Sequence, residues 1–274
     1  MALTFMFITN NPYIAIIAQK CGVERIWIDL ETLGKEERQH NMNTVKSHHT
    51  IRDICIVGKV LTKSQMLVRI NPLNDNSFKE INSVIEAGAD LIMLPMWKSV
   101  HDVNSFLQMV KGQAKTVLLL ETKEAVECLD SVLELTGIDE IHIGLNDLHL
   151  SYGMRFMFEP LSNGLVESIC KKINSKGIPY GFGGIAKIGE GILPAEHIIM
   201  EHYRLGSTRV ILSRSFCDAE KIQDMEKFEL EFRNNIKKIR DFEKLTNRFS
   251  QKDYKKNQLD VIKCVHDILS SKRK

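Results

Sequence analysis

The chain has 274 residues, which is longer than an ordinary domain but close to the roughly 250 that an α/β barrel uses as one unit. Hydrophobic residues make up 43% and charged residues 26%, a globular composition that argues against a disordered chain. Lys and Arg number 37 and Asp and Glu 35, which gives a net charge of +2. A chain of this charge lacks the strong positive potential of a general nucleic-acid or membrane-surface binder, so small-molecule partners are favoured.

The elements predicted in chain order alternate between short apolar or β-branched runs and longer segments of helical period. The predicted strands cover 3–9, 25–30, 66–70, 91–94, 116–120, 140–143, 178–181 and 209–212. The predicted helices cover 13–19, 78–87, 100–110, 122–135, 161–175 and 195–204. Eight strands with helices between them suit a closed (β/α)8 TIM barrel better than a doubly wound sheet.

Beyond about residue 218 the chain is predicted to be helical and highly charged, and this tail is longer than the eighth helix of a barrel requires. We therefore predict a catalytic barrel over 1–217 and additional C-terminal helices over 218–274 that complete it. A solvated helical face or an oligomer contact explains the basic residues of this tail better than a nucleic-acid arm does.

The six cysteines are widely spaced and form no CxxC pair, which favours a reducing cytoplasm over a disulfide framework or a structural zinc site. The apolar N-terminus has no basic start and soon meets Asn10, Asn11 and Pro12, so no signal peptide is expected. No apolar run approaches the roughly 20 residues of a membrane-spanning helix. The sequence thus predicts a soluble, cytoplasmic protein without a membrane partner.

Polar residues at the carboxyl ends of the predicted strands are the candidates for chemistry, because barrel enzymes build their active sites there. These residues are Asp29, Glu31, Arg69, Glu121, Asn146 and Asp147. Two of them, Glu121 and Asp147, are carboxylates without a nearby Cys or His, which suits a hard cation such as Mg²⁺ or Mn²⁺. Capping of the following helices is the alternative, and spacing alone does not decide between the two.

Arg69 closes an apolar strand, where its planar fork is suited to hold a substrate carboxylate and to stabilise an enolate. The alternative is a salt bridge to Glu121 or Asp29 that stabilises the barrel rim. Asp29 and Glu31 are predicted to point the same way, because strand side chains repeat every second residue. One of them is suited to orient a water on the cation, and hydrogen bonds to the neighbouring strand ends are the alternative.

The run Gly181-Phe182-Gly183-Gly184 is predicted to follow the seventh strand. Its backbone N–H groups suit a phosphate or carboxylate, and a tight turn explains the glycines equally well.

Five motifs in order make residues 25 to about 213 resemble the HpcH/HpaI aldolase and citrate lyase β-subunit family. They are Ile-Asp-Leu-Glu at 28–31, Val-Arg-Ile-Asn-Pro at 68–72, Ala-Gly-Ala-Asp-Leu-Ile-Met-Leu-Pro-Met at 87–96, Leu-Glu-Thr-Lys-Glu-Ala-Val at 120–126 and Ile-Asp-Glu-Ile-His-Ile-Gly-Leu-Asn-Asp-Leu at 138–148. The resemblance implies the same barrel fold.

The resemblance also implies roles for individual residues. Glu121 and Asp147 become ligands of Mg²⁺ or Mn²⁺, and Arg69 becomes the contact of the bound carboxylate and the enolate oxygen. The backbone around Gly144, Leu145 and Asn146 becomes a cradle for the carboxylate. The family's pyruvate aldolases carry a histidine directly after the acidic pair, where this chain has Thr32, so the resemblance does not identify the residue that transfers the proton.

The function expected from these observations is that of a divalent-metal-dependent carbon–carbon lyase, a class II aldolase acting on a 2-oxo acid, with Asp29, Glu31 and Arg69 as its catalytic residues. The resemblance further implies assembly into a homo-oligomer through the terminal helices. One alternative is a lyase for citramalyl- or malyl-CoA-type thioesters. Another is a catalytically silent protein that binds metal and pyruvate for assembly, because the histidine is replaced by Thr32.

Overall fold

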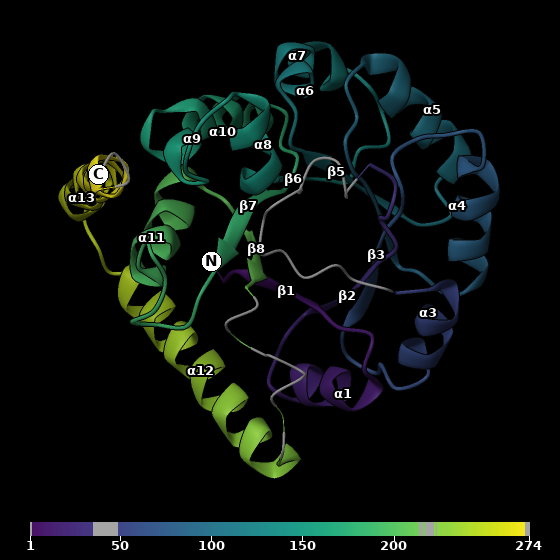
Figure 1. Ribbon diagram of the computed structural model, residues 1–274, viewed down its shortest axis with the longest axis horizontal. Coiled ribbons are helices and arrows are strands. Elements are labelled where there is room, and N and C mark those ends of the chain that lie inside the picture. The colour runs from purple at the N-terminus through teal and green to yellow at the C-terminus, as the bar shows by residue number, and fades with distance from the viewer. Residues whose placement is uncertain (1, 35–48, 214–215, 217–221, 223, 272–274) are drawn as a thin grey trace. The chain divides into compact units, whose positions relative to one another are not determined.

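The computed structural model describes residues 2–34, 49–213, 216, 222 and 224–271. Figure 1 shows the arrangement of the labelled strands and helices.

The eight strands form a closed barrel in sequence order, β1 to β8. They are β1 (Thr4–Ile8), β2 (Arg25–Asp29), β3 (Gln65–Arg69), β4 (Leu91–Leu94), β5 (Lys115–Leu120), β6 (Glu140–Ile143), β7 (Tyr180–Ile185) and β8 (Arg209–Leu212). The pairings of β1 with β2, β2 with β3, β3 with β4, β4 with β5 and β7 with β8 are parallel. The predicted (β/α)8 fold is therefore confirmed.

The helices lie between the strands and, beyond β8, at the C-terminal end of the chain. They are α1 (Pro12–Lys20), α3 (Ile51–Gly58), α4 (Ser77–Glu86), α5 (Val100–Val110), α6 (Lys123–Glu127), α7 (Leu129–Val132), α8 (Leu145–Ser151), α9 (Glu159–Ser162), α10 (Leu165–Ser175), α11 (Ala195–Leu205), α12 (Met225–Thr246) and α13 (Gln251–Ser271). Over the described residues, we find no helix with the length and apolarity needed to cross a membrane.

Two predicted helices are each divided in the structure. The helix predicted over 122–135 is divided into α6 and α7 at Cys128, whose ψ of 5° departs from helical geometry. The helix predicted over 161–175 is divided into α9 and α10 around Gly164, which has a φ of 89° that residues with a Cβ rarely adopt. The apolar residues on either side of Cys128 and Gly164 keep a helical spacing, so the sequence pattern did not reveal these breaks.

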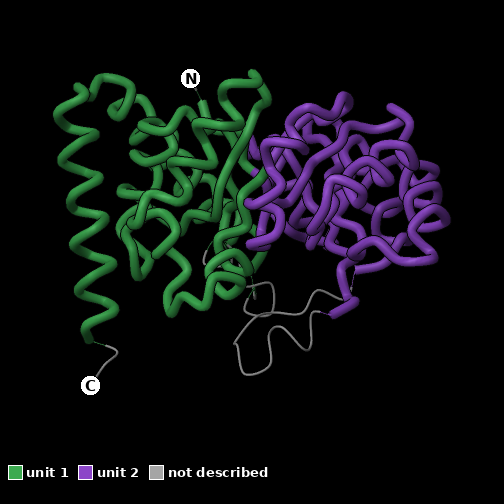
Figure 2. Tube along the Cα trace, turned by 90° about the horizontal axis from the view of Figure 1, so that it is seen from above, with its two compact units in different colours: residues 1–5, 142–274 green, residues 6–141 purple. Residues whose placement is uncertain are grey.

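The chain divides into two compact units, residues 6–141 and residues 1–5 with 142–274, which Figure 2 shows in different colours. In the first unit, β2 is buried along its whole length. The register of β2 on β3 pairs Arg25 with Gln65 at one end and Asp29 with Arg69 at the other. This register decides which polar side chains meet at the carboxyl ends of the two strands.

In the second unit, α12 and α13 are attached by buried polar contacts. The Glu243 carboxylate on α12 accepts a hydrogen bond from the Leu3 N–H at 2.7 Å, and Arg240 donates to the Leu3 carbonyl at 2.8 Å. On α13, Asn257 donates to the Glu201 carboxylate of α11 at 3.0 Å. Residue 217 lies outside the described residues, so the division into 1–217 and 218–274 stays a prediction.

The same unit contains β7, which continues through the glycines that the sequence placed after it. A Cβ on Gly181 would lie 2.2 Å from the Arg209 carbonyl oxygen of β8, so only glycine allows the two strands to approach this closely. A register shift between Gly181 and Gly184 marks a bulge. The glycines therefore belong to the strand, and the prediction of a turn or loop at this place was wrong.

Candidate active site

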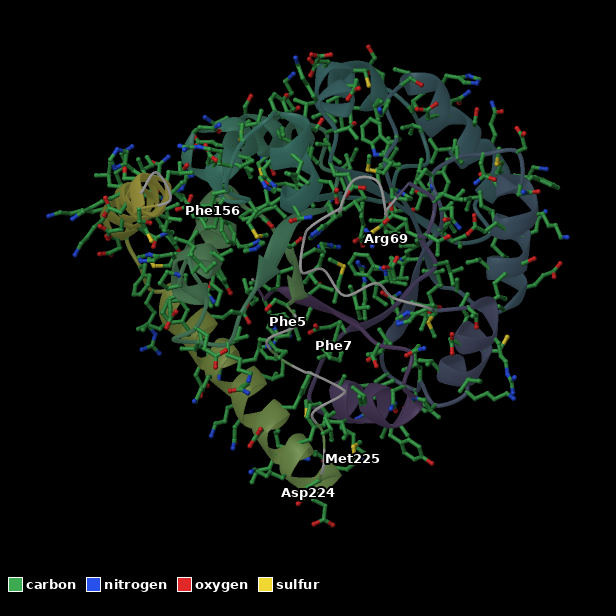
Figure 3. All side chains as sticks on the ribbon, in the orientation of Figure 1. Phe5, Phe7, Arg69, Phe156, Asp224 and Met225 are labelled. Atoms are coloured by element: carbon green, nitrogen blue, oxygen red, sulfur yellow. The ribbon has the colours of Figure 1, made fainter. Side chains whose placement is uncertain are left out.

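A two-point ion pair joins Arg69 to Asp29 at the carboxyl ends of β3 and β2. Arg69 Nε donates to Asp29 Oδ1 at 2.8 Å, and Nη2 donates to Oδ2 at 2.9 Å. Arg69 is labelled among the side chains of Figure 3. The third nitrogen, Nη1, lies 3.1 Å from Glu31 Oε2. Asp29 and Glu31 thus point the same way, as the alternation of strand side chains predicted.

The Arg69 side chain is only 12% exposed and lies over the Trp27 ring, with 5.2 Å between the guanidinium carbon and the ring centroid. Burial by itself lowers the pKa of Arg69, but the charges of Asp29, Glu31 and Glu121 and the hydrogen bonds to Asp29 outweigh it, so the pKa lies above its usual value. The guanidinium is therefore a permanent, fixed positive charge.

The contact with Asp29 is the salt bridge that the sequence analysis gave as an alternative role for Arg69. It does not occupy the whole side chain, because a guanidinium carries five N–H donors and the contacts to Asp29 and Glu31 involve one from each nitrogen. Among the described residues, these contacts leave one N–H on Nη1 and one on Nη2 for a ligand. The arrangement holds the fork rigid and still leaves it able to bind a carboxylate.

Glu121 follows β5 directly and is 3% exposed. Its Oε1 accepts a hydrogen bond from the Met96 N–H at 3.1 Å, and Met96 takes a left-handed φ of 54° that is uncommon for a residue with a side chain. The N-cap of α6 is Thr122, which accepts from the Ala125 N–H. Glu121 is therefore not the cap of that helix, and its carboxylate oxygens are the kind of ligand that Mg²⁺ and Mn²⁺ prefer.

The segment Gly144 to Asp147 belongs to the other unit, where it begins α8. Gly144 is the N-cap, and Asp147 lies in the first turn, where backbone N–H groups have no partner within the helix. Leu145 is buried and packs near Gly183 of β7, since a Cβ added to Gly183 would lie 2.7 Å from Leu145 Cδ1. Glu121 and Asp147 thus lie in different units of the chain.

No group of three or more His, Cys, Asp or Glu side chains among the described residues is arranged to hold a metal ion. Two carboxylates with water are a sufficient donor set for Mg²⁺, which usually keeps several of its waters. The chemistry of the two predicted ligands therefore fits such an ion.

Two features near Asp29 were not recognised in the sequence. His49 Nδ1 accepts a hydrogen bond from the Asp29 N–H at 3.0 Å, although 20 residues separate the two. Thr32 donates to Asn71 Oδ1 from its N–H at 2.9 Å, and the Asn71 amide donates to Glu80 at 2.8 Å. Asn71 lies in the Val-Arg-Ile-Asn-Pro motif, which was the available signal, whereas no local pattern marks His49 as a neighbour of the site.

The sequence model of the HpcH/HpaI aldolase/citrate lyase family matches residues 3–159, more than half of the chain. The protein therefore belongs to the HpcH/HpaI aldolase/citrate lyase family and is an enzyme of the aldolase or lyase class. This membership agrees with the resemblance seen in the five sequence motifs.

Among individual proteins, the chain is 26% identical over 206 residues to the 2-keto-3-deoxy-L-rhamnonate aldolase of Salmonella gallinarum, a match that covers 64% of this chain and 71% of that protein. Its fold is similar to that of the HpcH/HpaI aldolase from Desulfitobacterium hafniense DCB-2, with a TM-score of 0.61 and 16% identity over 87% of this chain and 93% of the other. It is also similar to the citrate synthase SbnG, with a TM-score of 0.59 and 16% identity over 77% and 86% of the two chains. At these identities the structural likeness shows the fold alone.

Proposed function

We propose that this protein is a divalent-metal-dependent carbon–carbon lyase of the class II aldolase type, acting on a 2-oxo acid through a pyruvate-type enolate. The observation that carries the proposal is the guanidinium of Arg69, held by Asp29 and Glu31 at the strand ends of an aldolase-family barrel. A relative named for the cleavage of a 2-keto-3-deoxy acid supports a 2-oxo acid as the substrate class.

Glu121 and Asp147 are the proposed ligands of Mg²⁺ or Mn²⁺. The assignment is supported by their oxygen-donor chemistry and by the family motifs in which both stand. A bound cation supplies Lewis acidity to the carboxylate and the 2-oxo group of the substrate.

Arg69 binds the substrate and stabilises the charge that develops during the reaction. When the carbon–carbon bond breaks, its electron pair passes to the 2-oxo fragment as an enolate, and the proton of the aldol hydroxyl passes to a water that Asp29 or Glu31 orients. The two remaining N–H groups of Arg69 donate to the oxygens of this fragment. Asp29 and Glu31 hold the guanidinium in place beforehand, so no reorganisation is needed at the moment of reaction.

The turn before α8 binds the substrate carboxylate through its backbone. The residues proposed for this contact are Gly144, Leu145 and Asn146. Two arguments support this assignment: the family motif in which these residues stand, and the backbone N–H groups of a helix's first turn, which have no partner within the helix and can donate to an anion. Assembly into a homo-oligomer in the cytoplasm completes the proposal and rests on the sequence.

The test is exchange of the methyl hydrogens of pyruvate in D₂O, followed by NMR with Mg²⁺, with Mn²⁺ and with EDTA. It detects enolisation without the unknown second product. We expect metal-dependent exchange by the wild type that is abolished in Asp147→Ala. Asp130→Ala, which removes an exposed aspartate on α7, serves as the matched control and should exchange normally.

The remaining outcomes separate the alternatives. Absence of exchange with either metal would reject the pyruvate reaction. Cleavage of a malyl- or citramalyl-type CoA thioester by the same preparation would then favour the thioester lyase. Binding of both metal and pyruvate in calorimetry, without exchange or cleavage, would favour the silent binding protein.

A further inference from the structure

His49 lies against the end of β2, at the edge of the strand that faces β1. The Trp27 carbonyl accepts a hydrogen bond from the Thr9 N–H at 3.2 Å. The backbone N–H and C=O groups of the odd-numbered residues of β2 therefore point toward β1. β1 ends at Ile8. Two residues beyond Trp27, the N–H of Asp29 donates to the imidazole of His49 instead of to a strand. The ring therefore lies where the barrel opens at its carboxyl end.

The backbone of His49 is fixed as well as its ring. The next residue, Thr50, is the N-cap of α3, and both its N–H and its hydroxyl donate to the Asp53 carboxylate, at 2.6 and 2.9 Å. The half-buried ring is thus held between a capped helix and the Asp29 N–H. A side chain fixed at both ends loses little further freedom when it binds a ligand.

The contact with Asp29 also decides the tautomer of the ring. A backbone N–H is only a donor, so Nδ1 must accept and is unprotonated. In the neutral imidazole the proton is then on Nε2, and this nitrogen is a hydrogen-bond donor and not a base. Thr32, which replaces the family histidine, does not supply this donor in the structure, because its hydroxyl contacts Asn71 Oδ1 at 3.3 Å.

We infer that His49 donates a hydrogen bond from Nε2 of its neutral imidazole to the substrate oxygen on which negative charge develops. The inference rests on the proposed function. Asp29 then positions two donors toward the enolate: its carboxylate holds Arg69 and its backbone N–H holds His49. No proton leaves His49 in this role, so the imidazole is the same before and after the reaction.

Two substitutions separate this role from a structural one. In His49→Asn, the amide oxygen reproduces the Nδ1 acceptor for the Asp29 N–H, and nothing replaces Nε2. In His49→Gln, the longer side chain places an amide N–H close to the Nε2 position. His101→Asn, at an exposed site on α5, is the matched control.

We expect His49→Asn to lower the rate of metal-dependent pyruvate exchange about 100-fold, with little change in KM, as loss of one oxyanion donor does in other enzymes. His49→Gln should retain more activity than His49→Asn, and His101→Asn should match the wild type. Wild-type exchange by His49→Asn would overturn the inference and leave the proposed function standing.

A second measurement does not depend on turnover. Long-range ¹H–¹⁵N NMR of protein with labelled histidines should show His49 with an unprotonated Nδ1 and a protonated Nε2. Oxalate, a planar dianion that resembles the pyruvate enolate, added with Mg²⁺, should shift the Nε2 signal. A proton on Nδ1, or an Nε2 signal that oxalate leaves unchanged, would overturn the inference even if the wild type exchanges pyruvate. If the wild type does not exchange pyruvate, the proposed function fails and the inference fails with it, whereas normal exchange with an unchanged Nε2 signal would reject the inference alone.

Discussion

Asp29 and Arg69 are register partners on β2 and β3, and their side chains repeat that pairing as an ion pair with two hydrogen bonds of 2.8 and 2.9 Å. The strand register thus places a guanidinium directly over the end of the neighbouring strand. A lysine at this position keeps the charge but lacks the planar fork that contacts both oxygens of Asp29 and one of Glu31.

We therefore predict that Arg69→Lys lowers pyruvate exchange about 100-fold, because the donors aimed at the enolate oxygen are lost. The rate is measured by NMR at saturating Mg²⁺, and circular dichroism establishes that the variant is folded. Arg52→Lys, on the exposed surface of α3, is the control. A wild-type rate for Arg69→Lys would show that the fork is not used.

A second ion pair, at the amino ends of β2 and β6, should contribute to stability and not to catalysis. Arg25 donates to both oxygens of Glu140 at 2.6 Å, and both residues are at most 5% exposed. Arg25→Met leaves the Glu140 carboxylate buried without its guanidinium, and removal of one partner of such a pair costs about 3–5 kcal/mol. The free energy of unfolding in urea measures this loss.

The double variant Arg25→Met with Glu140→Leu is the control for that prediction. It should recover most of the lost stability, because no buried charge is left without a partner. A loss in the double variant as large as in Arg25→Met would mean that packing, and not the buried carboxylate, causes the effect.

Much of the barrel was predictable because its strands are short apolar runs with clear ends. The predicted bounds of β4, β6, β8 and α5 agree with the structure residue for residue. Helix α5 is well marked because Ser99 and Asp102 form a capping box before its apolar period. Helix α8 was missed because seven mostly polar residues carry too little periodicity to identify a helix.

The candidate site was predictable only where it follows from strand ends. Asp29 and Arg69 were expected at the same end of the barrel, and their contact follows from the register of adjacent strands. Glycine carries no side-chain pattern, so the sequence did not show that Gly183 and Gly184 belong to β7. His49 reaches Asp29 by tertiary folding across 20 residues, which local sequence rules do not describe.

The buried His202 should make the protein less stable in acid. Its ring stacks on Phe182 with 3.9 Å between ring centroids, and its Nδ1 lies 2.7 Å from the Ser207 hydroxyl. Burial, and then the neighbouring His142, lower the pKa of His202 well below its usual value. The folded protein therefore holds this ring neutral, while the unfolded chain binds a proton below about pH 6.5.

Because the unfolded state binds the extra proton, the contribution of the neutral His202 ring to the free energy of unfolding is fully present above about pH 6.5. It is lost as the pH decreases, by up to about 1.4 kcal/mol per pH unit. Urea unfolding between pH 8 and pH 5 measures the slope. The slope should be smaller for His202→Asn and unchanged for His266→Asn, which alters an exposed ring on α13. Equal slopes for His202→Asn and the wild type would exclude His202 as the cause.

Gly183 supports the turn that we propose to bind the substrate carboxylate. It has a φ of 51°, its carbonyl lies 3.1 Å from His142 Nε2, and an added Cβ would lie 2.7 Å from Leu145 Cδ1. Gly183→Ala therefore combines a strained backbone with a clash against the first residue of α8. Gly177→Ala is the matched control, because Gly177 has a similar φ of 67° and no atom within 4 Å of the added Cβ.

Gly177→Ala should cost about 1–2 kcal/mol of unfolding free energy from the left-handed backbone alone. Gly183→Ala should cost about 1–3 kcal/mol more, from overpacking against Leu145. If the clash displaces the turn, KM for pyruvate should rise in Gly183→Ala and stay unchanged in Gly177→Ala. Adding Leu145→Ala to Gly183→Ala removes the obstructing side chain and should restore part of the stability. Equal losses in the two single variants would mean that the contact between Gly183 and Leu145 does not position the turn.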